Sequence, residues 1–248
     1  MKSGTRQNSD KMNLNRREDR VGYTARLKGS AVGMAVAPHP IHRVGILGAG
    51  QMGAGIAAAH VRVGIPCILI DLDAERLQDG LERARHMLDR QVKTGESTSQ
   101  DVDRMMGRIT VSTDRRTLAS CDLVIEAIIE DEAAKTETFR KLGDILGDAS
   151  IVASNTSTIP IGRMASSAPD PGRFAGMHFF HPVDRMELVE IIRGERTDDR
   201  TIASLDTLAR RLGKVAIVVN DCPGFLRAYS ISTFAKRFAC SKKESRWT

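Results

Sequence analysis

The fold is decided by the stretch Val44-Gly45-Ile46-Leu47-Gly48-Ala49-Gly50-Gln51-Met52-Gly53. An apolar run gives way here to three glycines with the spacing G-x-G-x-x-G, which is typical of a strand that enters a helix through a phosphate-binding turn. Gly48 allows the tight turn, Gly50 lets the backbone approach a pyrophosphate, and Gly53 lets the helix pack closely on the strand. The first N–H groups of such a helix have no partner within the helix and point at the anion.

The residues that follow supply the context that this motif needs. Residues 54–63 are small and apolar and predict a helix, and residues 67–70 predict a second strand. Asp71 ends that strand, 21 residues after the second glycine, where a carboxylate accepts a hydrogen bond from an adenosine ribose. Leu72 and Asp73 follow instead of a cation, so a 2′-phosphate would meet negative charge. The sequence therefore predicts NAD rather than NADP; the alternative is an ordinary glycine-rich turn.

Composition places the chain among globular proteins. Of its 248 residues, 41% are apolar and 27% are charged. No window approaches the roughly 18 to 20 apolar residues of a spanning helix, and the N-terminus lacks the apolar core of a signal peptide, so we expect no membrane insertion and a cytoplasmic location. Neither a metal site nor a disulfide framework is expected, because no C-x-x-C pair occurs among the four separated cysteines, Cys67, Cys121, Cys222 and Cys240.

The high isoelectric point, near 9.3, raises the hypothesis of a nucleic-acid partner. Residues 1–43 carry nine Lys or Arg against three acidic residues, and residues 227–248 carry six against one. The remaining residues, 44–226, hold 22 basic and 27 acidic side chains. Because the basic character lies in the flanks and aromatic residues are only 4%, we expect no nucleic-acid partner.

Strands and helices alternate along most of the chain. Residues 1–40 form a basic N-terminal extension without apolar periodicity and are expected to be disordered. The predicted strands are 41–47, 67–70, 109–111, 123–128, 150–154, 173–180, 188–192 and 215–219. The predicted helices are 51–64, 74–92, 132–146, a short helix that Pro160 starts, and 199–212, with residues 94–103 as a surface excursion. These repeated βα units predict an α/β fold, a doubly wound parallel sheet of the Rossmann type with extra strands.

His178 and Glu190 are candidates for acid–base chemistry. His178 lies late in the predicted strand 173–180, and Glu190 lies in the predicted strand 188–192. Neighbouring strands would bring the two side chains together, and a buried carboxylate stabilises the imidazolium that a general base becomes. The alternative is a histidine that is merely hydrogen-bonded within the core.

Six motifs occur in order between residues 41 and 225. They are Gly48 to Gly53, Glu126-Ala127-Ile128-Ile129-Glu130 with Lys135, residues 154–161 (SNTSTIPI), residues 176–180 (GMHFF), residues 188–194, and residues 218–225 (VVNDCPGF). In these motifs the sequence resembles the NAD-binding domain of the 3-hydroxyacyl-CoA dehydrogenases, most closely the dehydrogenase segment of fatty-acid oxidation complex α-subunits. The resemblance implies NAD-dependent oxidation of (S)-3-hydroxyacyl-CoA to 3-ketoacyl-CoA in β-oxidation.

The resemblance also implies roles for individual residues. His178 is the implied catalytic base, Glu190 is its partner, and Ser157 touches both the substrate oxygen and the nicotinamide. His181 stands where the family usually has asparagine, and both residues donate hydrogen bonds. The cofactor-binding residues implied in this way are Gly48, Gly50, Met52, Gly53, Asp71, Ile129, Glu130, Lys135, Ser157 and His181, with no metal ligand.

The resemblance stops after Phe225 or Leu226. Ala228 stands where the family has an active-site asparagine, and we expect the C-terminal helical domain, which covers the acyl-CoA site and forms the homodimer interface, to be missing. Residues 226–248 are interpreted as an aberrant tail, the product either of a shifted reading frame or of a natural truncation. The alternative function is therefore an NAD-binding remnant without catalytic activity.

Overall fold

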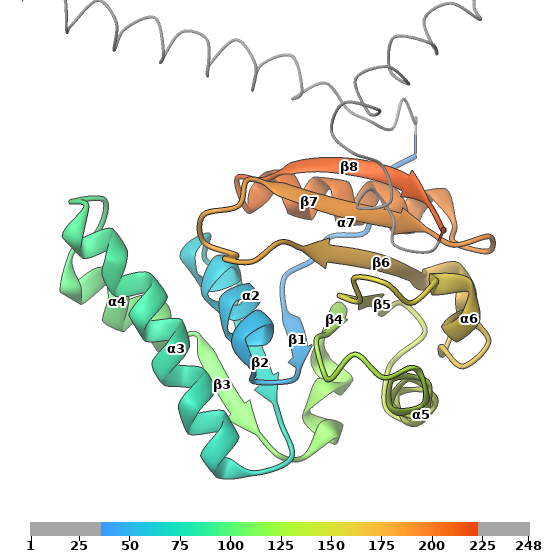
Figure 1. Cartoon of the computed structure of the whole chain (residues 1–248), viewed down its shortest axis with the longest axis horizontal. Helices are drawn as coiled ribbons and strands as arrows, with labels where there is room; N and C mark the ends of the chain where they lie inside the picture. The colour runs from blue at the N-terminus through green and yellow to red at the C-terminus, as the bar shows by residue number, and fades with distance from the viewer. Residues whose placement is uncertain (1–35, 223–248) are drawn as a thin grey trace, which may run out of the picture. The chain divides into compact units, whose positions relative to one another are not determined.

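An eight-stranded sheet forms the centre of the chain in the computed structural model, which describes residues 36–222 (Figure 1). The strand order is β3-β2-β1-β4-β5-β6-β7-β8, and every neighbouring pair is parallel except β6 with β7. The strands are β1 (Val44–Leu47), β2 (Cys67–Ile70), β3 (Ile109–Ser112), β4 (Leu123–Glu126), β5 (Ile151–Ser154), β6 (Phe174–Phe179), β7 (Leu188–Arg193) and β8 (Val215–Asn220). This order confirms the predicted Rossmann-type α/β fold with extra strands.

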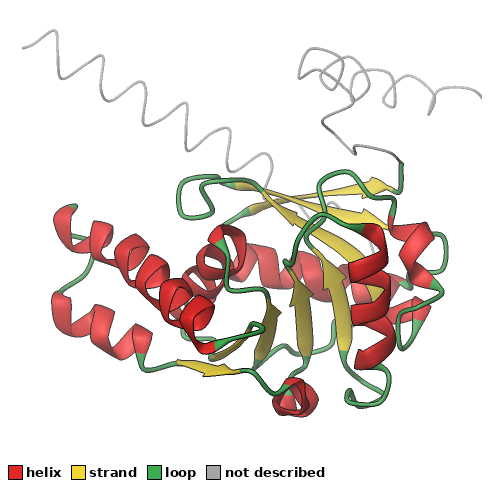
Figure 2. Cartoon of the chain, turned by 60° about the horizontal axis from the view of Figure 1, so that its bottom comes forward, coloured by secondary structure: helices red, strands yellow, loops and turns green. Residues whose placement is uncertain are grey.

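Helices cover both faces of the sheet (Figure 2). Phe174 and Phe179 on β6 point to opposite faces, because side chains alternate along a strand and the two positions differ by an odd number. Phe174 contacts Phe139 of α5 edge to face, and Phe179 lies against His60 of α2. The helices are α2 (Gln51–Arg62), α3 (Ala74–Lys93), α4 (Ser99–Met106), α5 (Glu132–Leu142), α6 (Ile161–Ala165) and α7 (Asp199–Arg211), with 3-10 turns at Arg115–Ser120 and Pro171–Arg173.

The central strands are buried along their whole length. Every residue of β1, β2, β4, β5 and β6 is buried, which explains why these segments read as continuous apolar runs and not as alternating ones. Glu126 and Ser154 are the polar exceptions in β4 and β5, and His178 is the exception in β6. A polar group buried among apolar neighbours needs a hydrogen-bond partner, so each of these three points to a local network.

The polar segment 94–103 differs from its prediction as a surface excursion. Its second half begins helix α4, where the Thr98 side chain accepts from the Asp101 N–H and the Asp101 side chain accepts from the Thr98 N–H. This reciprocal capping box stabilises a helix start even in a polar sequence. Val102 is the one residue of this helix that is fully buried.

Several elements are shorter than predicted, for identifiable reasons. The first strand begins at Val44 instead of Ile41, because the N–H groups of His42 and Arg43 donate to the Asp122 carboxylate. Pro160 is the N-cap of α6 and not its first residue, and the Asp221 carboxylate accepts from the N–H groups of the first two helical residues. The remaining limits differ by a few residues at turns such as the C-cap Gly143 of α5.

The reversal at β7 is the main departure from an all-parallel sheet. The connection from β6 to β7 contains only residues 180–187, and a parallel crossover needs a dozen or more residues. A connection of this length makes the two strands antiparallel, and the longer segment through α7 then places β8 parallel to β7. The pairing sets His178 directly opposite Glu190.

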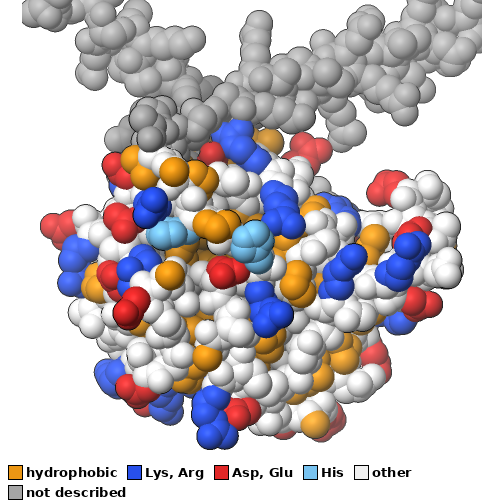
Figure 3. Space-filling model, turned by 180° about the vertical axis from the view of Figure 1, so that it is seen from behind, with side chains coloured by type: hydrophobic (Ala, Val, Ile, Leu, Met, Phe, Trp, Pro, Cys, Tyr) orange, Lys and Arg blue, Asp and Glu red, His pale blue; other side chains and the backbone are white. Residues whose placement is uncertain are grey.

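Some predictions lie outside the described residues. These concern the extension 1–40 apart from residues 36–40, and Cys240, Ala228 and the tail 226–248. Residues 36–42 lie along α7, where Ser204 accepts from the His39 N–H and Arg211 donates to the Ile41 carbonyl. Among residues 36–222, no helix is long and apolar enough to cross a membrane. The face in Figure 3 carries Lys, Arg, Asp and Glu side chains intermixed.

Candidate active site

The candidate residues gather at one edge of the sheet because parallel strands end in the same direction. Leu47, Glu126, Ser154 and Gly176 form one row across β1, β4, β5 and β6. The glycine turn (residues 48–53) leaves the row after β1, and Glu130, Ser157 and His178 come within four residues of it on the other strands. Since β1 lies between β2 and β4, the chain diverges here to both sides and opens the crevice in which such sheets bind ligands.

The glycine turn has no space for side chains on its inner side. Gly48 has φ +101°, and a Cβ there would lie 2.5 Å from the Ala127 carbonyl oxygen. A Cβ on Gly53 would lie 1.7 Å from the Gly48 carbonyl oxygen, so the helix can approach the strand only with glycine at this position. At Gly50, by contrast, a Cβ would meet no atom within 4 Å, so the backbone there faces an open crevice.

The start of α2 is electrostatically prepared for an anion. Gly50 is its N-cap and offers no side-chain hydrogen bond, and no acidic residue occupies the first turn. The N–H groups of this turn and the positive end of the helix dipole therefore point at the crevice without a carboxylate to neutralise them.

Asp71 borders a small cavity of about 490 Å³ beside the glycine turn. Its carboxylate accepts from the Ala49 N–H at 2.6 Å and from the Leu72 N–H at 2.7 Å, which fixes its position at the end of β2. Each carboxylate oxygen has a second lone pair for a ribose hydroxyl. The cavity is lined by Ala49, Gly50, Gln51, Asp71, Arg76, Asp79 and Arg83.

Two exposed apolar side chains lie near this crevice. Leu72 is 74% exposed and follows β2, and Ile129 is 68% exposed and follows β4. These two strands flank β1 on either side, so both side chains lie at the edge that carries the glycine turn. An apolar side chain exposed to this extent is suited to contact a flat aromatic ligand such as a nucleobase.

Glu126, Lys135 and Glu130 form a linked network at the ends of β4 and β5. The Lys135 side chain is only 1% exposed, and its Nζ donates to Glu126 Oε1 at 2.6 Å and lies 3.3 Å from Glu130 Oε2. Glu126 is fully buried and also accepts from the Ser154 hydroxyl and the Ile128 N–H. Lys135, which the resemblance implies as a cofactor-binding residue, has its ammonium group between these two carboxylates.

Glu130 in turn organises the turn that carries Ser157. Its Oε1 accepts from the Thr156 hydroxyl at 2.6 Å, the Ser157 N–H at 2.8 Å and the Thr158 N–H at 3.2 Å. Partial burial opposes its ionisation, but these hydrogen bonds and the charge of Lys135 outweigh burial and lower the pKa of Glu130 to about 2. The carboxylate is therefore a fixed anion that templates the backbone around Ser157.

His178 and Glu190 are paired as the strand prediction expected. His178 Nδ1 lies 2.6 Å from Glu190 Oε2, across the antiparallel register of β6 and β7. Glu190 is fully buried and His178 is 6% exposed. A carboxylate acceptor at Nδ1 selects the tautomer with the proton on Nδ1, so that Nε2 carries the lone pair. Asn155 accepts from the Phe179 N–H and ties this strand to the end of β5.

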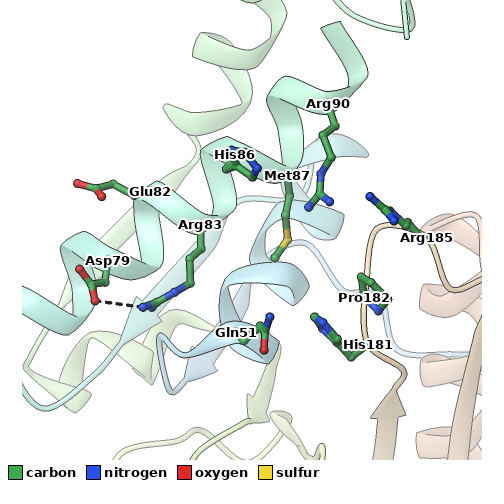
Figure 4. A pocket seen from close by; sticks show the side chains of 10 residues that line it. All are labelled: Gln51, Asp79, Glu82, Arg83, His86, Met87, Arg90, His181, Pro182 and Arg185. Carbon is green, nitrogen blue, oxygen red and sulfur yellow. Dashed lines mark hydrogen bonds and ion pairs between the residues drawn. The ribbon is translucent and has the colours of Figure 1, made fainter. Parts of the chain in front are cut away.

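His181 lies at a second, larger cavity of about 610 Å³ (Figure 4). One wall is helix α3, the other is the 180–187 loop between β6 and β7, and Gln51 of α2 lies between them. Arg90 and Arg185 approach from opposite walls, and Arg83 is paired with Asp79 at 3.1 Å. The lining residues are Gln51, Asp79, Glu82, Arg83, His86, Met87, Arg90, His181, Pro182 and Arg185.

The family follows from a comparison with known sequences. The model described as "3-hydroxyacyl-CoA dehydrogenase, NAD binding domain" matches residues 43–222, which is most of the chain. The chain belongs to this family. The fatty acid oxidation complex subunit alpha of Psychrobacter arcticus is 42% identical over 188 residues, which are 76% of this chain and 26% of that protein. The chain thus spans about a quarter of the length of this curated relative.

Two solved structures with at least 37% sequence identity have the same fold. FadB2 of M. tuberculosis is 38% identical with a TM-score of 0.74, over 81% of this chain and 73% of that one. The (S)-3-hydroxybutyryl-CoA dehydrogenase of Ralstonia eutropha is 37% identical with a TM-score of 0.75, over 84% of this chain and 74% of that one. NAD is the cofactor of the matched domain, and the open turn at Gly50, the uncapped start of α2 and the Asp71 carboxylate fit it.

Some residues that line the two cavities or join their networks were not singled out from the motifs. Arg76 lines the small cavity beside Asp71. Its guanidinium group is paired with Asp73 at 3.2 Å. Glu126 belongs to one of the motifs, but the resemblance implies no role for it. The feature that marks it in the sequence is a charged residue inside a continuous apolar run. Three nitrogen-bearing side chains of the large cavity recur at helical spacing on one face of α3, namely Arg83, His86 and Arg90.

Proposed function

We propose that the chain catalyses the NAD-dependent oxidation of (S)-3-hydroxyacyl-CoA to 3-ketoacyl-CoA in fatty-acid β-oxidation. The observation that carries the proposal is the buried His178–Glu190 pair, which lies at the same sheet edge as the glycine turn. A base for an alcohol proton and a site for a hydride acceptor are the two parts that such an oxidation needs.

His178 is the general base of the proposed reaction. Its Nε2 takes the proton of the 3-hydroxyl group, and the imidazolium that forms is stabilised by the Glu190 carboxylate 2.6 Å from Nδ1. Bound NAD would supply the acceptor for the hydride that leaves C3. In the reverse direction the Nδ1 bond to Glu190 holds the imidazolium so that Nε2–H polarises the ketone.

Ser157 is proposed to contact both the substrate oxygen and the nicotinamide. It follows the carboxyl end of β5, one strand away from His178, and is half-buried. Glu130 fixes it through its N–H, and the Ser157 hydroxyl lies at the limit of hydrogen-bond distance from the same carboxylate, at 3.4 Å. The hydroxyl can therefore turn to a ligand at small cost.

The large cavity is proposed to receive the phosphate-bearing part of coenzyme A. Arg83, Arg90 and Arg185 line it from two walls, and His181 connects it to the strand that carries His178. Guanidinium groups are suited to phosphates because their N–H groups match two phosphate oxygens at once. Asp79 and Glu82 at the same cavity partly offset this charge.

The test is turnover of 3-hydroxybutyryl-CoA with NAD, followed by NADH absorbance. His178→Ala is expected to lower the rate by about 10²- to 10⁴-fold, because it removes the general base. The NAD affinity is expected to stay within about threefold, since the base acts on the substrate. His42→Ala, an exposed histidine away from the crevice, is the matched control.

Two results would contradict the proposal. One is a His178→Ala variant that retains most of the rate. The other is an unsubstituted protein that binds NAD without any turnover, which would support the NAD-binding remnant instead.

A further inference from the structure

The 180–187 loop forms one wall of the large cavity, and its position decides how wide that cavity is. His181, Pro182 and Arg185 face the cavity from this loop, opposite α3 (Figure 4). The loop is not part of the sheet, so contacts other than the ladder must hold it. The N–H groups of Arg185 and Met186 both donate to the Pro182 carbonyl, which makes the loop a compact turn.

Lys214 binds this turn from its inner side. Its Nζ donates to the Val183 carbonyl and to the Met186 carbonyl, each at 2.7 Å, and the residue is only 7% exposed. Gly213 directs it there, because its φ of +75° turns the chain back after α7. The neighbouring Val215 N–H donates to the Glu187 carbonyl, so this part of the chain also binds the last residue of the loop.

The other contacts of the loop are weaker. Val183 is buried against α2, where a Cβ on Gly55 would lie 2.9 Å from the valine side chain. Arg90 Nε lies 3.5 Å from Asp184 Oδ2, which is an ion pair without a well-formed hydrogen bond. Without the Lys214 side chain the loop would therefore remain attached by Val183 and by the Val215–Glu187 hydrogen bond, but two of its carbonyl groups would have lost their donor.

The positive charge of Lys214 does not by itself stabilise the folded chain, because the ammonium group is buried. Burial lowers the pKa of Lys214 to about 8, the charge of Arg62 on α2 adds to this effect, and Asp184 and Glu187 of the loop oppose it. Lys214 and Arg211 on α7 both lie within electrostatic range of His60 on α2. A buried ammonium with this pKa is less stable than one in water, so an apolar side chain would avoid the cost of its desolvation.

We propose that Lys214 is a positioning residue whose ammonium group fixes the 180–187 loop and thereby sets the shape of the cavity that receives coenzyme A. The part about coenzyme A rests on the proposed function. The part about the loop rests on the two hydrogen bonds to its carbonyl groups alone. Lys214 touches neither cavity, so its effect on binding passes through His181, Pro182 and Arg185.

The experiment compares Lys214→Met and Lys214→Arg with Lys141→Met, an exposed lysine on α5 that serves as the matched control. Amide hydrogen exchange of Arg185 and Met186 reports the loop, and calorimetry measures the affinities for coenzyme A and for NAD. Lys214→Met is expected to raise exchange in the loop and to weaken coenzyme A about tenfold, while the NAD affinity stays within about threefold. Lys214→Arg keeps the positive charge and the hydrogen-bond donors. It is therefore expected to show a smaller rise in loop exchange and a smaller loss of coenzyme A affinity than Lys214→Met.

A series of exchange measurements at different pH values tests the charge of Lys214 separately from the packing of its side chain. In the unsubstituted protein, loop exchange corrected for its intrinsic rate is expected to rise between pH 7 and pH 9, as the Lys214 ammonium deprotonates. Lys214→Met is expected to lack this rise.

A failure of the Lys214 proposal can be told apart from a failure of the proposed substrate site. Unchanged loop exchange in Lys214→Met would overturn the proposal, and so would exchange that rises equally in the central strands, because the lysine would then act on global stability. If the unsubstituted protein failed to bind coenzyme A, the proposed substrate site would be wrong, while the exchange data would still decide the role of Lys214.

Discussion

Asp71 shares the small cavity with two guanidinium groups, those of Arg76 and Arg83. Both cations already have acidic partners, Asp73 at 3.2 Å and Asp79 at 3.1 Å. The preference between NAD and NADP therefore depends on one carboxylate among cations that are largely neutralised. Asp71 attracts a ribose hydroxyl and repels a 2′-phosphate, whereas the arginines would accept that phosphate if Asp71 were absent.

We expect Asp71→Ala to lower the ratio of NAD to NADP affinity about tenfold or more, because it removes both the hydroxyl acceptor and the repulsion. Calorimetry with the two cofactors measures this ratio. Asp73→Ala is the control, since it removes a neighbouring carboxylate and releases Arg76 but leaves Asp71 in place. Equal affinities for the two cofactors in the unsubstituted protein would show that Asp71 does not select between them.

Single residues differ in how far the sequence predicts their surroundings. The steric roles of Gly48 and Gly53 were predictable, because they follow from a local motif and the structure shows no room for a side chain at either position. The His178–Glu190 contact was predictable from two neighbouring strands. The burial of Lys135 was not, because it depends on how α5 packs against the ends of β4 and β5.

The step from β4 to α5 depends on a buried ion pair. Lys135 is held between Glu126 and Glu130, and the Glu126 carboxylate has no contact with solvent. Removing one member of such a pair leaves a buried charge without compensation, which costs more than the pair contributes. The loss of either partner is therefore expected to destabilise the packing of α5 against β4.

We expect Lys135→Met to lower the free energy of unfolding by about 3–5 kcal/mol, because Glu126 is left charged and buried. Urea unfolding followed by far-UV circular dichroism measures this change. The double variant Glu126→Leu with Lys135→Met is expected to recover most of the stability but not the NAD affinity, since Glu130 still lacks its cation. If Lys135→Met were as stable as the parent, the pair would not hold the element.

The elements themselves were predicted in order, and the misses have physical causes. Continuous apolar runs predicted the buried strands, because both faces of those strands are covered. Helix α4 was missed because it buries little beyond Val102 and is stabilised at its start by the Thr98–Asp101 capping box. The reversal at β7 was missed because apolar pattern carries no information on strand direction, whereas the short connection does.

The stability of the whole domain depends on pH through a histidine far from the crevice. His60 is fully buried on α2, and burial lowers the pKa of His60 to about 4, while its hydrogen bond to Ile56 opposes this shift and Lys214 and Arg211 add to it. Because the folded state binds the proton less well than the unfolded chain, the contribution of neutral His60 is complete above about pH 6.5. It is lost as the pH falls from there to about 4.

We expect His60→Leu to be less sensitive to acid than the parent, because it removes this titration. Between pH 7.5 and pH 5 the parent should lose about 2 kcal/mol more of its unfolding free energy than the variant does. Urea unfolding at the two pH values measures the difference, and His42→Leu, at an exposed position, is the control. Parallel loss of stability in His60→Leu and in the parent would show that other groups govern the acid response.

The opposite directions of β6 and β7 also decide where this chain tolerates changes in length. His178 faces Glu190 because of the ladder on either side of them and not because of the number of residues between the strands. Residues added between 180 and 187 would reshape the cavity wall but leave the pair intact. One residue added within either strand would turn every following side chain to the other face of the sheet. Relatives are therefore expected to differ in the length of this connection. Their two strands are expected to differ in residue type but to keep the same number of residues.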